Sequence, residues 1–172
     1  GYLLKLIAFV SNEYRVDPDR IYLYGHSNGG FMANRMACDA GEKFAGIASL
    51  AGSTYKDLSH CKSKNPIAYL QGHGTADETI LFNGAESYPS ATEISRNWAE
   101  RNGCKETSET LQAHSFKFLK KTRETDVLAW TGCKDGADVS LWRMNGVGHV
   151  PFLKRKATKL AVDFLLQHKR GS

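Results

Sequence analysis

The chain has 172 residues, 41% of them hydrophobic and 24% charged, a balance typical of one globular domain with a buried core. We therefore interpret residues 1–172 as a single domain and exclude a disordered chain. No apolar run approaches the roughly 20 residues that a membrane-spanning helix needs. The opening segment also lacks the basic start and small-residue cleavage pattern of a signal peptide. The sequence predicts a soluble chain without a membrane partner.

The chain carries a net charge of +5 and has an isoelectric point near 9.0, which would suit a polyanion-binding protein. Its basic residues are scattered, however, apart from short clusters within 117–123, 154–156 and 169–170. Aromatic residues do not interleave with these clusters, as they do in many single-strand-binding surfaces. We interpret the clusters as solvated surface and expect no nucleic-acid partner.

Helical and strand-like patterns alternate along the chain, which is typical of a parallel sheet with crossover helices. The helices are expected over 2–15, 29–40 and 91–102, with a last one whose apolar face spans 157–165. The strands are expected at 21–24, 46–51, 67–71, 125–131 and 138–144. A turn at 134–137 joins the last two strands, and no repeat or linker suggests a domain boundary.

The sequence Gly-His-Ser-Asn-Gly at 25–29 follows one predicted strand directly and precedes a predicted helix. A serine on so sharp a turn needs small neighbours two residues away on each side, because larger side chains would clash with the strand and helix. This arrangement predicts a nucleophile elbow with Ser27 as the nucleophile. The backbone N–H of Asn28 is then the expected oxyanion donor, and His26 is expected to line the acyl pocket.

A nucleophilic serine needs a base and an orienting acid, which follow it in the order acid, then histidine, in elbow-containing enzymes. Asp77 ends a glycine-punctuated loop after the strand at 67–71, and His149 ends a similar loop after the strand at 138–144. We therefore predict Asp77 as the acid and His149 as the base. Asp57 is the second candidate for the acid, and His73 is interpreted as structural because it lies so close to Asp77.

Each of the three predicted catalytic residues also has an ordinary structural interpretation. Ser27 could be a small residue in a tight turn, Asp77 could cap a turn, and His149 could hold a glycine-rich loop. The sequence contains neither phosphate-binding nor dinucleotide-binding glycine patterns, and it has no helical two-histidine zinc motif. We expect a reaction that uses no metal and no cofactor.

The elbow, the segment 73–77 and the pair at 148–149 resemble motifs of α/β-hydrolase esterases of the feruloyl esterase and polyhydroxybutyrate depolymerase type, which are grouped with carbohydrate esterases. Segments 16–22, 44–48, 101–104 and 130–133 are also similar to this family. The resemblance implies an α/β-hydrolase core, with a mainly parallel sheet and helices on both faces. It also implies a carboxylic ester hydrolase in which Ser27, His149 and Asp77 form an acyl-enzyme. Its substrates would be small or polymer-linked feruloyl, acetyl or hydroxyalkanoate esters.

The chain departs from this family at its start, because the family's opening strands and its second oxyanion loop have no counterpart here. An N-terminally truncated fold is therefore expected. The chain is then a fragment, a naturally minimal esterase, or a fold that a missing segment or a second copy in a homodimer completes. Losing one oxyanion donor lowers turnover by about 100- to 1,000-fold. The alternatives are a catalytically impaired fragment, a non-catalytic binding module, and an acyltransferase that discharges the same acyl-enzyme onto an alcohol.

Four cysteines occur without Cys-x-x-Cys spacing or clustered histidines, which favours disulfides over a zinc site or free thiols. Four cysteines allow three connectivities. The family resemblance implies a bridge between Cys104 and Cys133, and with it one between Cys38 and Cys61. Disulfides are typical of oxidising compartments, so we expect a secreted or extracellular protein, with the periplasm as an alternative.

Overall fold

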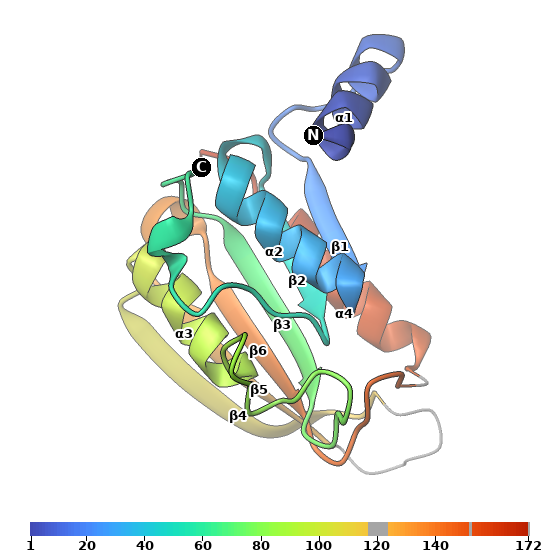
Figure 1. Ribbon diagram of the computed structural model, residues 1–172, viewed down its shortest axis with the longest axis vertical. Coiled ribbons are helices and arrows are strands. Elements are labelled where there is room, and N and C mark those ends of the chain that lie inside the picture. Colours follow the sequence, from blue (N-terminus) through green and yellow to red (C-terminus); the bar gives the residue numbers. More distant parts are fainter. Residues whose placement is uncertain (117–123, 152, 172) are drawn as a thin grey trace.

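The computed structural model describes residues 1–116, 124–151 and 153–171, and these form a six-stranded sheet (Figure 1). The strands are β1 (Tyr22–His26), β2 (Gly46–Leu50), β3 (Ala68–Gly74), β4 (Glu106–His114), β5 (Thr125–Thr131) and β6 (Val139–Met144). Their order in the sheet is β1-β2-β3-β6-β5-β4. β1, β2, β3 and β6 are parallel, whereas β5 and β4 add antiparallel strands at one edge.

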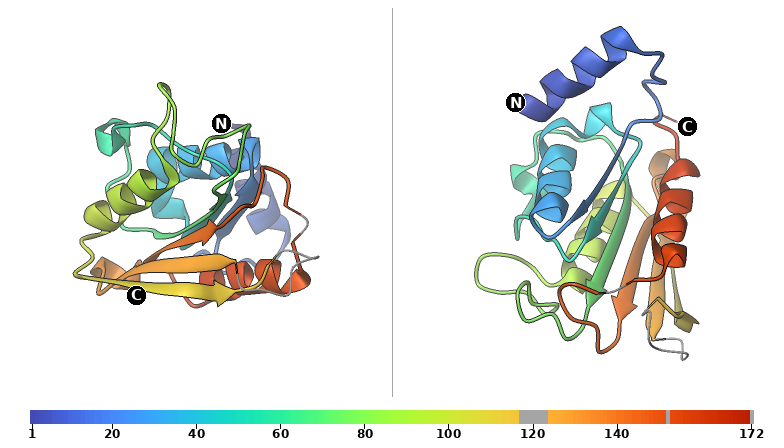
Figure 2. Two further views of the ribbon diagram at one scale, coloured as in Figure 1. Left: turned by 90° about the horizontal axis from the view of Figure 1, so that it is seen from below. Right: turned by 90° about the vertical axis from the view of Figure 1, so that its right-hand side faces the viewer.

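Helices cover both faces of the sheet, as the sequence predicts (Figure 2). The helices are α1 (Tyr2–Glu13), α2 (Asn28–Ala40), α3 (Ala91–Asn102) and α4 (Arg155–Leu166), with short 3₁₀ turns at Gly41–Lys43, Leu58–His60 and Lys134–Gly136. α2 packs on β1 and β2 and α3 on β3 and β6, whereas α4 packs on β2 and β3 from the opposite side. The described chain is therefore a three-layer α/β arrangement.

Two hydrophobic cores result, because successive side chains of a strand point to opposite faces of the sheet. Ile47 and Tyr69 belong to the core under α2 and α3, where Trp98 is also fully buried. Their neighbours Ala48 and Leu70 belong to the core under α4. The strands are consequently apolar on both faces, as expected for a parallel sheet covered by helices.

β4 is absent from the strands that the sequence predicts. Most of its residues are exposed, so it lacks the alternation of apolar and polar side chains by which a half-buried strand is detected. Charged residues such as Glu109, whose carboxylate lies 2.7 Å from the Arg143 guanidinium, also suit an edge strand, because they discourage pairing with another chain. The other predicted strands and helices are present, with ends displaced by a few residues.

The basic cluster at 169–170 is partly neutralised within the fold. Arg170 Nη2 lies 2.8 Å and Lys169 Nζ lies 3.8 Å from the Asp19 carboxylate. The hydrogen bond from Arg170 is the main reason that the pKa of Asp19 lies below its usual value. The cluster within 117–123 lies outside the described residues. Among the helices that the structure describes, none combines the length and apolar character that crossing a bilayer requires.

The β1 edge of the sheet and helix α1 expose apolar surface. β1 has a hydrogen-bonded neighbour on one side, β2, and no residue of α1 is buried. Tyr2 is 77% exposed, Phe9 is 62% exposed, and Tyr24 of β1 is 44% exposed. α1 lies beyond the amino end of β1 (Figure 1 and the right-hand view of Figure 2), where its Leu4 and Ile7 contact the core under α2 and α3. The described residues leave this apolar surface exposed.

Two disulfides link elements at the amino edge of the parallel strands. Cys38, near the end of α2, is bonded to Cys61, which precedes β3, and Cys104, just after α3, is bonded to Cys133, which precedes β6. This is the pairing that the family resemblance implies. Ser27 and the loops that follow β3 and β6 lie at the opposite, carboxyl edge of the sheet (Figure 1).

Candidate active site

Ser27 occupies the sharp turn between β1 and α2. Its backbone has φ 54° and ψ −120°, a left-handed conformation that is uncommon for a residue with a side chain. Such strain costs about 1–3 kcal/mol and persists where surrounding contacts impose it. Here the Ser27 N–H donates to the Leu50 carbonyl at 2.8 Å, and the Ser27 carbonyl accepts from Phe31 in the first turn of α2. The turn therefore projects the hydroxyl from the carboxyl edge of the sheet.

The glycines around Ser27 are not equivalent. A Cβ added at Gly25 would lie 2.2 Å from the Gly29 carbonyl oxygen, so this position requires glycine. At Gly29 an added Cβ would meet no atom within 4 Å, and the predicted steric need for glycine there is wrong. The second constrained position is Gly30, whose added Cβ would lie 2.8 Å from Ser49 Oγ and 3.0 Å from Gly52 Cα. The close packing is therefore between the start of α2 and the end of β2.

The structure brings Ser27, His149 and Asp77 together in one hydrogen-bonded series. His149 Nε2 lies 2.9 Å from Ser27 Oγ, and His149 Nδ1 lies 2.8 Å from Asp77 Oδ2. Because a carboxylate oxygen only accepts, the imidazole proton belongs on Nδ1. Nε2 then presents its lone pair to the serine hydroxyl, which is the arrangement that proton removal from the serine requires.

Asp77 is buried, and several N–H groups hold its carboxylate. Oδ1 accepts hydrogen bonds from the backbone N–H groups of Thr79 at 2.9 Å and Ile80 at 2.8 Å, while Oδ2 faces His149. Burial alone would raise the pKa of Asp77, but the hydrogen bonds from His149, Ile80 and Thr79 outweigh it and leave the pKa below its usual value. Asp77 thus caps a turn and contacts the imidazole at the same time.

The loops that carry Asp77 and His149 are bonded to each other. Thr75 N–H donates to the Met144 carbonyl and Ala76 N–H to the Val147 carbonyl, each at 3.0 Å. A Cβ at Gly74 would lie 2.1 Å from the Val147 carbonyl oxygen, so the two loops can approach this closely only with glycine at position 74. The acid and the base are therefore positioned by one shared backbone structure.

The second candidate acid, Asp57, a further carboxylate at Asp126, and His73 make other contacts. Asp57 caps the 3₁₀ turn at Leu58–His60, with the backbone and hydroxyl of Ser59 as donors. Asp126 contacts Arg143 at 2.9 Å within the antiparallel part of the sheet. His73 is buried, and its two ring nitrogens face Gln71 and the Ile80 carbonyl. His73 therefore has no ring nitrogen available for Ser27.

Asn28 begins α2, so its backbone N–H belongs to the first turn, where N–H groups have no partner within the helix. That position and the positive end of the helix dipole make it a suitable donor to a developing oxyanion. His26 lies on another side of the site. Its Nε2 is 2.8 Å from the His149 carbonyl, and it lines a cavity of about 210 Å³ together with Val150 and Pro151.

A larger cavity, of about 460 Å³, lies between α2 and the loop after β2 and reaches Asn28, the residue after Ser27. Its walls include Asn28, Phe31, Met32 and Arg35 of α2, and Tyr55 of the loop. The Arg35 guanidinium lies 5.6 Å from the centre of the Tyr55 ring. The sequence did not identify this cavity, although the three apolar or basic residues follow the elbow on one helix. Tyr55 joins them only because the loop folds back over α2.

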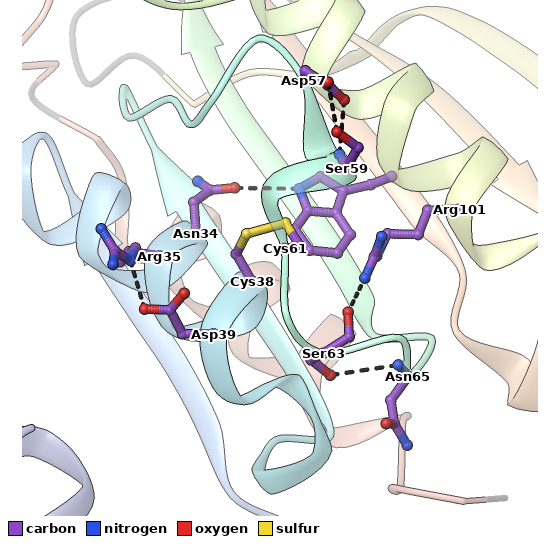
Figure 3. The surroundings of a disulfide bond; sticks show 11 residues. Asn34, Arg35, Cys38, Asp39, Asp57, Ser59, Cys61, Ser63, Asn65 and Arg101 are labelled. Atoms are coloured by element: carbon purple, nitrogen blue, oxygen red, sulfur yellow. Dashed lines mark hydrogen bonds and ion pairs between the residues drawn. A yellow bond between two sulfur atoms is a disulfide. The ribbon is translucent and has the colours of Figure 1, made fainter.

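The disulfide between Cys38 and Cys61 lies close to this loop (Figure 3). Cys38 is one turn after Arg35 on α2, and Cys61 ends the segment that carries Tyr55. Arg35 also forms an ion pair with Asp39 at 2.6 Å, which fixes the guanidinium along the helix. The covalent link therefore ties the loop to the helix that forms the opposite wall of the cavity.

Metal ligands do not gather in the described part of the chain, where no three His, Cys, Asp or Glu side chains could hold one ion. The hydrogen-bonded series of Ser27, His149 and Asp77 is arranged as a path for proton transfer between protein groups. The geometry of this site is thus that of acyl transfer through a serine.

Relatives of the chain include feruloyl esterase B of Piromyces equi, 30% identical over 84% of this chain, and feruloyl esterase D of Neurospora crassa, 29% identical over 86%. The chain spans 27% and 46% of the lengths of these two proteins. Among solved structures, an acetyl xylan esterase from Aspergillus awamori superposes with a TM-score of 0.68 at 16% identity, over 95% of this chain and 66% of that one. This likeness establishes an α/β-hydrolase fold. Because the model of the prolyl oligopeptidase family matches residues 3–168, the chain belongs to that family.

Proposed function

We propose that this protein is a serine-dependent carboxylic ester hydrolase. The observation that carries the proposal is the unbroken hydrogen-bonded series from Ser27 Oγ through His149 to Asp77 at the carboxyl edge of the sheet. The esterase names of its relatives support an ester rather than a peptide substrate, although the family is named for a peptidase.

In the proposed reaction, Ser27 Oγ attacks the ester carbonyl while His149 Nε2 takes the hydroxyl proton. The tetrahedral oxyanion accepts a hydrogen bond from the Asn28 N–H. His149 then gives its proton to the departing alcohol, and an acyl-enzyme remains on Ser27. Water next attacks the acyl carbon with His149 again as base, which releases the acid and restores the serine. Asp77 stays ionised and stabilises the imidazolium in both steps.

We place the acyl group in the 460 Å³ cavity between α2 and the loop after β2. The leaving alcohol must lie beside His149, which protonates it, so the acyl group extends to the other side of Ser27, where Asn28 and Phe31 lie. The cavity is of a size that holds a small organic molecule, larger than an acetyl group needs, and Phe31 and Tyr55 offer ring surfaces. We therefore favour aromatic acyl groups, of the feruloyl class, over acetyl or hydroxyalkanoate groups.

The exposed edge of β1 supports a second part of the proposal. Chain segments that precede this one in a longer protein would pair with β1, cover Phe9 and Tyr24, and supply the second oxyanion donor. The partial coverage of the relatives is consistent with this, and a second copy of the chain is the alternative occupant. The two disulfides further support an oxidising compartment outside the cytosol as the place of action.

The first test is covalent labelling with a fluorophosphonate and hydrolysis of a short 4-nitrophenyl ester. We expect labelling at Ser27, and we expect Ser27→Ala to abolish both labelling and hydrolysis. Ser108→Ala, on the exposed edge strand β4, is the matched control and should retain both. Hydrolysis that survives in Ser27→Ala would contradict the proposal.

A second test uses a longer chain, extended at its amino end with the upstream strands of a relative. Comparing it with the unextended chain shows whether low activity comes from a missing oxyanion donor. We expect the extended chain to gain about 100- to 1,000-fold in turnover. If neither form labels or hydrolyses, the protein is a binding module. Product analysis with an added alcohol identifies an acyltransferase, and a dimer detected by light scattering in the unextended chain would favour the second copy.

A test of the acyl site compares 4-nitrophenyl esters of ferulic and acetic acid. Tyr55→Ala should lower kcat/KM for the feruloyl ester by about tenfold, since apolar pocket contacts contribute about 1–3 kcal/mol, and should leave acetate hydrolysis nearly unchanged. Leu111→Ala, on exposed β4, serves as the control. Equal losses for both esters would place the aromatic acyl group elsewhere.

A further inference from the structure

His73 is a buried imidazole that the proposed mechanism does not use. It is 1% exposed and lies beside the carboxylate of Asp77. His73 Nε2 is 3.3 Å from Asp77 Oδ2 and 2.8 Å from the Ile80 carbonyl oxygen. The T-shaped contact of its ring with Phe82 leaves little space for another orientation. The carboxylate of Asp77 is therefore adjacent to two imidazoles.

Two backbone carbonyls fix the position of the proton on His73. Gln71 Nε2 lies 2.9 Å from the Gly52 carbonyl, and because a carbonyl only accepts, the amide group must point its NH₂ there. The same NH₂ is 3.0 Å from His73 Nδ1, which therefore accepts. The ring proton must then be on Nε2, where it faces the Ile80 carbonyl.

Tyr69 supports this orientation of the amide. Its hydroxyl is 2.7 Å from Gln71 Oε1, and burial raises the pKa of Tyr69, so the phenol keeps its proton and donates it. Burial likewise lowers the pKa of His73, the largest of the influences on it, which favours the neutral ring. Each polar atom of the Tyr69–Gln71–His73 series thus has a partner of the matching kind.

The protonated Nε2 of His73 helps to hold the turn that carries Asp77. Ile80 donates its N–H to Asp77 Oδ1 and accepts the His73 Nε2–H at its carbonyl, so His73 closes the turn that holds the carboxylate. Three N–H groups, those of Thr79, Ile80 and His149, donate to the two carboxylate oxygens, and His73 Nε2 lies 3.3 Å from Oδ2. Rotation of Asp77 away from His149 would break several of these contacts at once.

We propose that His73 is a positioning residue for ester hydrolysis, and that its Nε2–H, placed by Gln71, holds the Asp77 turn so that Oδ2 stays directed at His149 Nδ1. This role rests on the proposed function of Asp77. It differs from the role of a core residue because it acts through one defined proton. Replacing His73 should then disturb the chemical step and leave substrate binding almost unaffected.

The experiment compares His73→Leu, which removes both nitrogens, with His73→Gln, whose amide can reach the position of Nε2 and donate there. The values of kcat and KM for a short 4-nitrophenyl ester are measured per fluorophosphonate-titrated site, with the chain in the form in which wild type is active. We expect kcat of His73→Leu to fall about 100-fold, the loss that a misplaced group causes, with KM within about threefold. His73→Gln should recover most of kcat.

Asn102→Ala is the matched control for general destabilisation. Asn102 is also buried and polar, and it bonds the backbone at Ile67 and Ala137, at the amino edge of the sheet. It should lower the melting temperature without lowering kcat per titrated site. A kcat of His73→Leu within threefold of wild type, or equal losses in His73→Leu and His73→Gln, would overturn the positioning role.

Nitrogen-15 and proton NMR of the histidine rings test the proposal without an activity measurement, in wild type and in the two His73 variants. We expect His73 to carry its ring proton on Nε2 and to be neutral at pH 7. The far-downfield proton between His149 and Asp77 should be present in wild type and His73→Gln and lost in His73→Leu. Wild type that shows these signals but hydrolyses no ester would contradict the proposed function alone. Protonation of His73 at Nδ1, or an unchanged downfield proton in His73→Leu, would contradict the positioning role.

Discussion

His26 Nε2 donates a hydrogen bond to the backbone carbonyl of His149, across 2.8 Å, and the two rings lie 5.0 Å apart. The residue that precedes the proposed nucleophile therefore holds the loop of the proposed base. Sequence reasoning assigned His26 to the acyl pocket. The structure places His26 against the His149 loop, in the wall of the smaller cavity, and its role in the acyl pocket stays a prediction.

His26→Ala should reduce kcat for every ester tested, because the loop of His149 loses one anchoring hydrogen bond. One such bond contributes about 0.5–1.5 kcal/mol, which corresponds to roughly a three- to tenfold loss. Steady-state kinetics with feruloyl and acetyl esters measure this. A change confined to KM, and to one leaving alcohol, would instead identify His26 as a substrate contact.

The two disulfides should differ in their effect on specificity. Removing either bridge, as Cys38→Ser with Cys61→Ser or Cys104→Ser with Cys133→Ser, should lower the free energy of unfolding by about 3–4 kcal/mol, from closed segments of 23 and 29 residues. The first pair alone ties the loop of Tyr55 to α2. Its removal should therefore lower the ratio of feruloyl to acetyl ester hydrolysis. The second double variant is the control, and the same ratio in both would refute this role.

Alanine substitutions should distinguish the two glycines of the elbow motif. Gly25→Ala places a methyl group against the Gly29 carbonyl and should destabilise the fold by at least about 1–3 kcal/mol. Gly29→Ala meets open space inside α2, where alanine is favoured over glycine, so it should be neutral or stabilise by up to about 1 kcal/mol. Urea unfolding followed by circular dichroism provides both values. Equal destabilisation would show that both glycines are sterically required.

Asp126 should contribute to stability in a pH-dependent way. Burial favours a raised pKa, but the Gln112 N–H, Asn145 and Arg143 outweigh it and keep the pKa of Asp126 below its usual value. The ionised carboxylate therefore stabilises the fold fully above its unfolded pKa, about 3.9, and this contribution disappears as the pH falls through the lower folded value.

Asp126→Asn should consequently be less stable than wild type at pH 7, by about 1–3 kcal/mol, and should lose less stability between pH 4 and pH 2. Thermal unfolding across that range measures the difference. Glu86→Gln, which removes one exposed carboxylate, is the control. Parallel stability curves for wild type and Asp126→Asn would rule out this contribution.

The sequence predicted most of the sheet because its parallel strands are apolar runs bounded by turns. Ser27, Asp77 and His149 could be placed for the same reason, since each follows a predicted strand and the carboxyl ends of parallel strands share one edge. β4 could not be predicted, because its polar residues face solvent and its pairing depends on β5.

The contacts around the candidate site could not be predicted from the sequence either. The sequence favours a structural His73, but the Gly52 carbonyl that orients the Gln71 amide is distant in the chain, and the direction of an amide follows only from coordinates. Tyr55 belongs to a loop without regular structure, so its place opposite Arg35 depends on tertiary folding. The steric importance of Gly30, in place of Gly29, likewise depends on how closely α2 approaches the end of β2.

Both disulfides lie at the edge of the sheet where the parallel strands begin, whereas Ser27, Asp77 and His149 lie at the opposite edge. Warming should therefore loosen the loops at the carboxyl edge of the sheet first, while the disulfides keep the strands in register at the amino edge. We expect such partly opened molecules to regain activity on cooling without a complete refolding cycle. The loops at the carboxyl edge can also change in sequence while both disulfides stay intact.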